Sequence, residues 1–376
     1  VHGTLTTQHR MRPEISALIR HATYPELKDG PKTKGRDHLR GVATNVVFID
    51  HDEREDGQGS MNAHDGQATV KSNAYEVGMV VRIVLYLCQQ GYSTDQLVIL
   101  TPYLGQLQEI RKALSSVKLS VQIGEQDLED LQDVLGSETS EEDDEDKRQL
   151  VINKSVRVAT IDNFQGEEAD IAVISLVRCN RDCNIGFLND EGRVNVLLSR
   201  AKLGQVIIGS SDTLCNAKST KGAELWKGYL KDIECAGFKY NGFPARCGCH
   251  GSKPRVLLSS PEAFQRCVPC GGCHLPCDFE LKCGHTCQKA CHPLDTQHLN
   301  VRCTEKVFVY CEKHGHLIEK ECAATKIPPC NVCKKLAKID AKANAKLNQL
   351  RKKEAKENEK HEEDLRRQKL EIEELR

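Results

Sequence analysis

The sequence predicts an α/β fold with a parallel sheet flanked by helices, followed by a Cys-rich irregular region and a long charged helix. In the first 240 residues, short β-rich apolar runs alternate with helical patterns, which is typical of βαβ units. One of these runs, residues 170–176, is apolar without period-2 alternation, as expected of a strand buried on both faces. Fourteen of the 19 cysteines lie between Cys247 and Cys333, which separates a second region from the first.

Strands and helices are expected to alternate through the first domain, residues 1–240. The expected strands span residues 45–49, 96–101, 155–161, 171–176 and 205–209. The expected helices span residues 14–21, 74–90, 105–114, 192–201 and 213–236. This order predicts one sheet with helices on both faces.

The overall composition excludes some classes of protein but selects no partner. The 376 residues carry a formal net charge of -1, so whole-chain electrostatics favour neither nucleic acid nor membrane. No apolar run of about 18 residues occurs in the sequence, so we expect neither a transmembrane helix nor a signal peptide. A Cys-dense chain of this kind is expected to bind metal rather than to be stapled by disulfides. A start at Val1 indicates a piece of a larger protein.

Two charged segments interrupt this pattern. Residues 125–146 carry twelve acidic side chains and no basic one, so the region 125–148 is interpreted as a disordered surface loop. A solvated insertion is the simple reading, and a regulatory mimic of a phosphate backbone is the alternative. Residues 334–376 predict a charged helix, either solvated or in a coiled coil that binds a protein partner.

Three polar clusters in the first domain indicate nucleotide chemistry. They are residues 5–13, residues 158–170 and residues 186–202, and they contain Arg10 and Arg200. Phosphoryl transfer spreads negative charge over the γ-phosphate oxygens, which a planar guanidinium can neutralise through two hydrogen bonds. Taken singly, each arginine could equally be a surface or capping residue.

The three clusters resemble motifs IV, V and VI of the Upf-like group of superfamily 1 helicases, and residues 99–103 resemble a further motif that touches nucleic acid. The resemblance covers about residues 1–215 and implies a second RecA-like domain with 5′ to 3′ polarity. It implies that Arg10 and Arg200 act on the γ-phosphate and that Gln165 and Gly166 sense the phosphate. Glu168 would contact the ribose, and Gln8 and His9 would line the nucleotide site, where His9 replaces the tyrosine common in relatives. The nucleic-acid strand would contact Thr101, Tyr103 and Thr160, although Tyr103 and Phe164 are equally explained as core or turn residues.

No Gly-x-x-x-x-Gly-Lys-Ser/Thr sequence occurs in the chain. In the family this phosphate-binding loop belongs to the first RecA-like domain. We therefore expect ATP and Mg²⁺ to bind only together with an upstream domain, and we expect the chain alone to hydrolyse no ATP.

The spacing of cysteine and histidine in residues 246–333 predicts about four tetrahedral Zn²⁺ sites. Repeated Cys-x2-Cys pairs and a Cys-x-His-x-Cys box supply thiolate and imidazole ligands, and metal binding is expected to drive folding of this region. Spacing alone leaves the assignment of ligands to individual metals open. The expected ligands are Cys247, Cys249, Cys267, Cys270, Cys273, Cys277, Cys283, His285, Cys287, Cys291, His292, Cys303, Cys311, His316, Cys322, Cys330 and Cys333.

Residues 283–292 resemble the NF-X-type zinc finger. A Upf-like core followed by such fingers is similar to an animal family of helicases with NF-X-type zinc fingers. This resemblance implies an RNA-binding, cytoplasmic helicase, associated with RNA granules, antiviral response and small-RNA silencing.

Two other functional classes remain open at this stage. Cys/His arrays also occur in ubiquitin ligases, which use a two-zinc cross-brace, so a ligase or scaffolding module with a vestigial helicase domain is the alternative. A catalytically silent platform is a further alternative, against which Arg10, Gln165 and Arg200 argue. RNA rather than DNA as the substrate rests on the family resemblance, because motors that grip the backbone largely do not read sequence.

Overall fold

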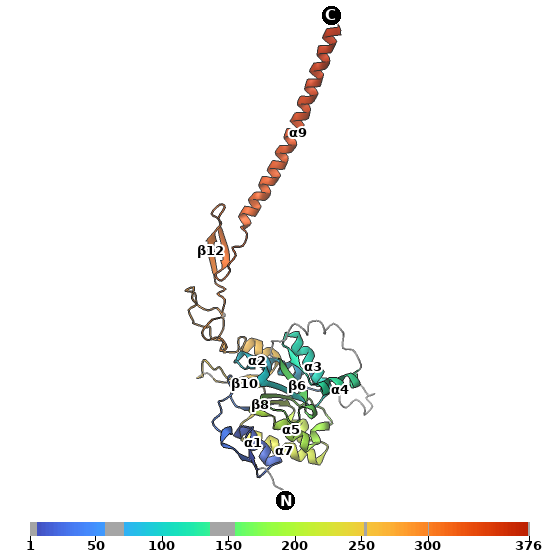
Figure 1. Cartoon of the computed structure of the whole chain (residues 1–376), viewed down its shortest axis with the longest axis vertical. Helices are drawn as coiled ribbons and strands as arrows, with labels where there is room; N and C mark the ends of the chain where they lie inside the picture. Colours follow the sequence, from blue (N-terminus) through green and yellow to red (C-terminus); the bar gives the residue numbers. More distant parts are fainter. Residues whose placement is uncertain (1–5, 57–70, 136–154, 252–253, 300, 375–376) are drawn as a thin grey trace. The chain divides into compact units, whose positions relative to one another are not determined.

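The computed structural model describes residues 6–56, 71–135, 155–251, 254–299 and 301–374. It consists of two compact units: Val1–Cys277 with Lys289–Gln297, and Asp278–Gln288 with His298–Arg376. Figure 1 shows the elements of both units.

A seven-stranded sheet forms the centre of the first unit, with the order β5-β6-β4-β7-β8-β3-β9 and all neighbours parallel. The α/β prediction is confirmed, and all five expected strands are present. The edge strands β5 and β9 have two residues each, too few to give a sequence pattern. The strands are β3 (Val46–Asp50), β4 (Leu97–Thr101), β5 (Val121–Gln122), β6 (Val156–Thr160), β7 (Ala169–Ser175), β8 (Ala201–Gly209) and β9 (Lys239–Tyr240).

Helices cover both faces of this sheet, because successive strand residues point to opposite faces and both sets are apolar. On β4, Ile99 packs toward α2 (Ala74–Gln89) and α3 (Leu104–Ser116), which lie on one face. The next residue, Leu100, packs on the opposite face. That face is covered by α1 (Pro13–Ala22), α5 (Glu191–Leu198), α6 (Ser211–Cys215) and α7 (Thr220–Cys235) (Figure 1).

Capping residues set the boundaries of several helices. The Asn73 side chain accepts a hydrogen bond from the Glu76 N–H at the start of α2, and Asp190 does the same for α5. The single helix expected over residues 213–236 is two helices, because Ser210 caps α6 and Ser219 caps a new start at α7.

The structure corrects the expectation of disorder for the first part of the acidic insertion. Residues Glu125–Leu135 form α4, and residues 136–148 lie outside the described part of the chain. Asp127 and Leu131 lie one helical turn apart and are both buried. The helix forms because one carboxylate is hydrogen-bonded and one leucine joins the core, so not all of the charge has to face water.

The compact unit continues past residue 240. The strands β10 (Phe243–Ala245) and β11 (Val256–Leu258) form an antiparallel pair, followed by α8 (Pro261–Cys267). The Tyr86 ring of α2 lies 5.4 Å from the ring of Phe243 and 6.2 Å from that of Phe264. These aromatic contacts join residues 243–268 to the core of the α2 face.

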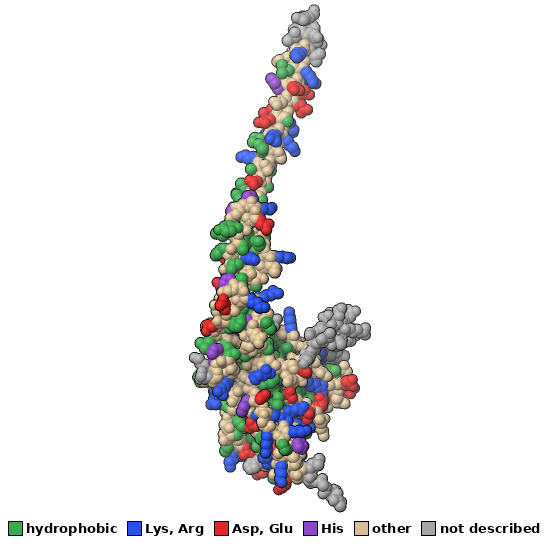
Figure 2. All heavy atoms as spheres, turned by 60° about the vertical axis from the view of Figure 1, so that its left-hand side comes forward, with side chains coloured by type: hydrophobic (Ala, Val, Ile, Leu, Met, Phe, Trp, Pro, Cys, Tyr) green, Lys and Arg blue, Asp and Glu red, His purple; other side chains and the backbone are tan. Residues whose placement is uncertain are grey.

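The second unit contains an antiparallel hairpin, β12 (Lys306–Tyr310) with β13 (Leu317–Glu321), and the long helix α9 (Asn331–Glu374). The expected charged helix is present, and Figure 2 shows basic and acidic side chains interspersed along it. Leu336, Ile339 and Leu350 are exposed on α9. The coiled coil stays a prediction. Within the described residues, no helix has an apolar stretch long enough to span a membrane.

Candidate functional site

Three of the predicted nucleotide-site residues meet where strands β7 and β8 begin. Glu168 directly precedes β7, and Arg200 directly precedes β8. Arg10, from the turn between β1 (Thr7–Gln8) and α1, donates from Nε to Glu168 Oε2 at 2.7 Å. Lys202 Nζ pairs with Glu168 Oε1 at 2.8 Å. The side chains of Lys202 and Arg10 lower the pKa of Glu168, which is therefore ionised at neutral pH.

Arg200 is held in a fixed orientation beside this pair. It is 9% exposed, and its guanidinium donates to the carbonyls of Val196 at 2.9 Å and Glu167 at 3.3 Å. Burial lowers the pKa of Arg200, and the neighbouring Arg10 charge lowers it further. Two guanidiniums and one ammonium thus surround a single carboxylate, which leaves an excess of positive charge.

This cluster borders a shallow pocket at the surface of the first unit. The Gln8 side chain makes its hydrogen bonds within the protein. Its Nε2 donates to Asp29 and to the Met11 carbonyl, and its Oε1 accepts from the Arg10 N–H at 2.9 Å, so Gln8 orders the turn. His9 is exposed and lies close to Gly30, where an added Cβ would lie 2.2 Å from His9 Nδ1. The pocket is lined by Gln8, His9, Arg10, Met11, Arg36, Glu168 and Lys202.

Gln165 and Gly166 lie in the loop that joins β6 to β7. Both are exposed, and Gly166 has a φ of 90°, a left-handed conformation that favours glycine. This turn redirects the chain so that Glu168 reaches the start of β7. The loop leads directly into Glu168, the residue that pairs with Arg10.

The predicted nucleic-acid residues lie at the opposite edge of the sheet. Thr101 and Thr160 are paired residues at the carboxyl ends of β4 and β6. A strand of five residues spans about 16 Å, so the two candidate sites occupy different edges. Thr160 is buried, and its hydroxyl donates to Asp127 of α4 at 2.6 Å.

Tyr103 occupies the core, the alternative that the sequence left open. It is 1% exposed, its hydroxyl donates to the Ile185 carbonyl, and its ring lies 5.4 Å from that of Phe187. Burial raises the pKa of Tyr103. Phe164 is likewise buried, so neither ring offers a surface for base stacking in this structure.

Sequence reasoning missed Arg36 and Asn163. Arg36 Nη1 donates to the carbonyls of Arg10 and Lys202 and so ties the two cation-bearing segments together. Asn163 donates to two carboxylates of α4. Arg36 stands alone in an irregular stretch with no motif to mark it. Asn163 lies within the polar cluster of residues 158–170, and this position in the motif was the signal that could have identified it.

The structure brings cysteines and histidines together in groups that could hold a metal ion, two within the second unit and one within the first. In each group, four ligand atoms lie within 4.8 Å of one another. The groups are Cys247, His250, Cys273 and Cys291; Cys283, His285, Cys303 and Cys322; and Cys311, His316, Cys330 and Cys333.

The separations within these groups fit tetrahedral zinc. Two thiolates bound at about 2.3 Å in tetrahedral geometry lie about 3.8 Å apart. The sulfur atoms of Cys247 and Cys291 are 3.7 Å apart, and those of Cys311 and Cys333 are 3.5 Å apart. The donor set of three thiols and one imidazole is typical of closed structural Zn²⁺ sites.

Hydrogen bonds favour the thiolate form of Cys247 and Cys283, which is the form that binds metal. Burial raises the pKa of Cys247, but hydrogen bonds from the Cys273 backbone and from His250 outweigh it and bring the pKa to about 6. The His285 backbone and side chain lower the pKa of Cys283 to about 7. Both thiols therefore lose their protons near neutral pH.

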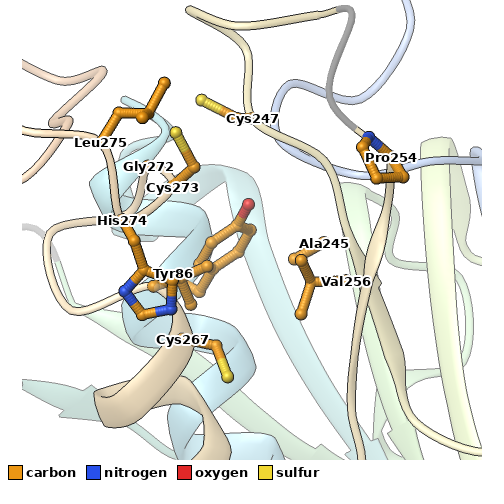
Figure 3. Close-up of a pocket in the computed structure, with 11 residues that line it drawn as sticks. Tyr86, Ala245, Cys247, Pro254, Val256, Cys267, Gly272, Cys273, His274 and Leu275 are labelled. Atoms are coloured by element: carbon orange, nitrogen blue, oxygen red, sulfur yellow. The ribbon is translucent and has the colours of Figure 1, made fainter.

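Some predicted ligands lie outside these three groups. Cys267, at the end of α8, borders an apolar pocket with Tyr86 and Val256, and Figure 3 shows its sulfur away from those of Cys247 and Cys273. The predicted ligands Cys249 and Cys270, both in the first unit, also lie outside the three groups.

His250 was not among the predicted ligands, although it directly follows a predicted Cys-x-Cys pair. Cys249 is exposed, and it lies near Cys291, where burial, Cys247 and Cys249 together raise the pKa of the Cys291 thiol. The order Cys-x-Cys-His offers both kinds of ligand, and only the backbone turn decides which one points inward.

A parallel sheet with arginines at one edge, followed by Cys/His groups, defines a helicase-type AAA domain with zinc fingers. Residues 2–212 match the family model described as "AAA domain", more than half of the chain. The chain belongs to this family and to its Upf-like superfamily 1 helicases.

Several curated proteins are similar over most of the chain. The NFX1-type zinc finger-containing protein 1 of Mus musculus is 31% identical over 346 residues, which cover 91% of this chain and 15% of that protein. Its Caenorhabditis elegans homolog is 28% identical, covering 85% of this chain and 12% of its own length. The regulator of nonsense transcripts 1 homolog of Arabidopsis thaliana is 30% identical, covering 61% and 16%. The chain thus spans 12–16% of the length of these relatives.

Proposed function

We propose that this chain supplies the second RecA-like half of an ATP-dependent RNA helicase motor, followed by zinc fingers that add a recognition surface. The observation that carries the proposal is the cluster of Arg10, Arg200 and Lys202 around Glu168, at the edge of the sheet where β7 and β8 begin. Three cations around one carboxylate suit a ligand with several negative charges, such as the triphosphate of ATP.

In this proposal the two arginines act on the γ-phosphate, where negative charge develops during transfer to water. Arg200 is orientated in advance by the carbonyls of Val196 and Glu167, so little reorganisation is needed when the phosphate arrives. Glu168 would exchange its contact with Arg10 for one with the ribose. Gln165 and Gly166, in the adjacent exposed loop, would sense the phosphate.

The chain's own contribution is charge and position. A phosphate-binding loop and Mg²⁺ would be supplied by a first RecA-like half, which would hold the β- and γ-phosphates. The pocket beside Gln8 and His9 would receive the nucleotide from that side. RNA as the strand, rather than DNA, is proposed from the resemblance to the Upf-like group.

The first test is the Arg200→Ala substitution in a protein that carries both RecA-like halves. We expect RNA-stimulated ATP turnover to fall about 10³-fold, because an arginine finger contributes about that much to phosphoryl transfer. RNA affinity should change by less than about twofold, because Arg200 lies at the edge opposite Thr160. Steady-state ATPase assays and RNA-binding titrations measure the two effects.

The matched control is Arg181→Ala, which removes an exposed arginine outside the cluster and should leave turnover unchanged. Full RNA-stimulated turnover in Arg200→Ala would exclude Arg200 from the reaction. The proposal as a whole fails if the two-half wild-type protein hydrolyses no ATP with RNA present.

A cytoplasmic location, association with RNA granules, and roles in antiviral response or RNA silencing are proposed on the family resemblance alone. Microscopy of the tagged protein alongside granule markers tests the location. Exclusive nuclear signal would contradict it.

A further inference from the structure

The carboxyl edge of the sheet holds a carboxylate where the proposed function places a nucleic-acid backbone. Asp127 of α4 is fully buried. Its Oδ1 accepts hydrogen bonds from the Thr160 hydroxyl at 2.6 Å and from Asn163 Nδ2 at 2.7 Å. Its Oδ2 accepts from the Thr160 N–H at 3.3 Å. Three donors thus converge on one carboxylate.

These donors have the chemistry of a phosphate site. A phosphodiester carries one negative charge and two non-bridging oxygens, and proteins bind it through hydroxyl, amide and backbone N–H donors of this kind. A carboxylate also carries one negative charge and two acceptor oxygens. A second carboxylate of α4 uses the same donors, because Asp130 Oδ2 accepts from the Asn163 amide at 3.1 Å.

A second observation at the same edge points to a missing partner. Thr101, paired with Thr160 on the neighbouring strand, is fully buried. Within the described part of the chain, its hydroxyl has no hydrogen-bond partner. A buried hydroxyl without a partner costs about 1–3 kcal/mol, so such groups are uncommon without a role.

The helix that supplies Asp127 is only lightly attached. One face of α4 carries Asp127 and Leu131, which are buried, whereas Gln126, Leu128 and Glu129 are exposed. Among its described side chains, one leucine and two carboxylates hold this helix, so it can leave its site at a modest cost in free energy. A strand of nucleic acid could therefore displace it.

We propose that Asp127 is an internal phosphate mimic, which occupies a phosphodiester-binding site made by Thr160 and Asn163 and must leave before single-stranded RNA binds there. The inference rests on the proposed function and adds its regulation: α4 lowers RNA affinity until the strand, or a partner that binds α4, displaces it. Asn163 becomes a phosphate-binding residue of this edge.

The test compares the complete chain with its Asp127→Asn variant, using fluorescence anisotropy of a labelled oligouridine over a range of salt concentrations. Asparagine keeps the size of the side chain but removes the charge and presents an amide N–H to donors. We expect affinity for the oligouridine to rise about tenfold or more, the value of one charge-assisted hydrogen bond. The matched control is Glu129→Gln, which removes the same charge from an exposed position of the same helix.

Hydrogen exchange provides a second, independent measurement. On addition of oligouridine, the amides of α4 should exchange faster, while those of α3 should keep their rates. Thermal unfolding of each variant shows whether it is folded.

Three outcomes overturn the inference. If Glu129→Gln raises affinity as much as Asp127→Asn, general repulsion explains the effect. If the wild-type chain binds but Asp127→Asn binds no tighter, or exchange in α4 slows with RNA, α4 does not compete with the strand. If neither protein binds oligouridine at any salt concentration, this edge is no phosphodiester site and the inference falls, whereas the proposed function is decided by the ATPase assay of the two-half protein.

Discussion

At the scale of single residues, Asp29 organises the turn that presents His9 and Arg10. Its Oδ1 accepts from Gln8 Nε2 at 2.7 Å and from the Ser16 hydroxyl at 2.6 Å, and its Oδ2 accepts from Arg20 at 2.9 Å. Burial raises the pKa of Asp29, but these three donors outweigh it, so the pKa lies below the ordinary value of 3.8. One carboxylate therefore links β2 (Lys28–Asp29) to both sides of the turn.

The Asp29→Asn substitution should lower the free energy of unfolding by about 1–3 kcal/mol at pH 7, because it weakens hydrogen bonds to a charged group. A lowered folded-state pKa stabilises the fold above the ordinary pKa, and this stabilisation is lost as the pH falls through the lowered value. The difference between wild type and variant should therefore shrink as the pH falls below about 4. Urea titrations at pH 7 and pH 3 measure it.

The matched control for this prediction is Asp182→Asn at an exposed position, which should change stability by less than about 0.5 kcal/mol. An equal deficit for Asp29→Asn at both pH values would show that charge is not the cause.

At the scale of elements, α8 shows that the core of the first unit includes residues beyond the sheet. Phe264 is 5% exposed and packs with Tyr86 of α2, and Leu258 of β11 joins the same apolar cluster. The sequence changes character near residue 246, where the cysteines begin, yet the apolar contacts continue. The change in composition near residue 246 is therefore not the boundary of the packed core, which extends through α8.

Phe264→Ala should destabilise the first unit by about 3–5 kcal/mol, the usual cost of a cavity left by a buried phenylalanine. Trp226, the single tryptophan of the chain, is fully buried on the opposite face of the same sheet and reports unfolding of this unit by its fluorescence. Urea titration followed at Trp226 gives the free energy.

Phe308→Ala provides the comparison, because Phe308 is 66% exposed and leaves no cavity. A loss below about 1 kcal/mol for Phe264→Ala would place α8 outside the cooperative core.

At the scale of the whole molecule, the two units are stabilised by different means. The first has apolar clusters on both faces of its sheet. The buried side chains described in the second unit are largely cysteines, namely Cys287, Cys303, Cys311 and Cys330, together with Leu281. The second unit is therefore expected to depend on metal for its fold.

Chelation with EDTA should release zinc and expose the thiols of the second unit, while the sheet stays folded. The measurements are the metal content after dialysis, the rate of thiol modification, and the emission of Trp226, which should not shift. Because thiolates are the ligands, release from the second unit should become easier as the pH falls through about 7, where Cys283 gains a proton. A red shift of Trp226 on chelation, or slow thiol modification throughout, would contradict this division.

The sequence by itself determined the parallel α/β class, the strands β3, β4, β6, β7 and β8, the long charged helix and the presence of metal-binding groups. Each depends on local pattern: apolar runs, helical periodicity, or cysteine spacing. Tertiary structure alone decided which cysteines share a group, since Cys247 and Cys291 are distant in the chain and adjacent in space. It also decided that Asp127 is buried against Thr160, because that contact links a helix and a strand across 33 positions. The run of acidic residues around Asp127 predicted a solvated loop. Only the folded chain supplies the donors, Thr160 and Asn163, that make burial of its carboxylate favourable.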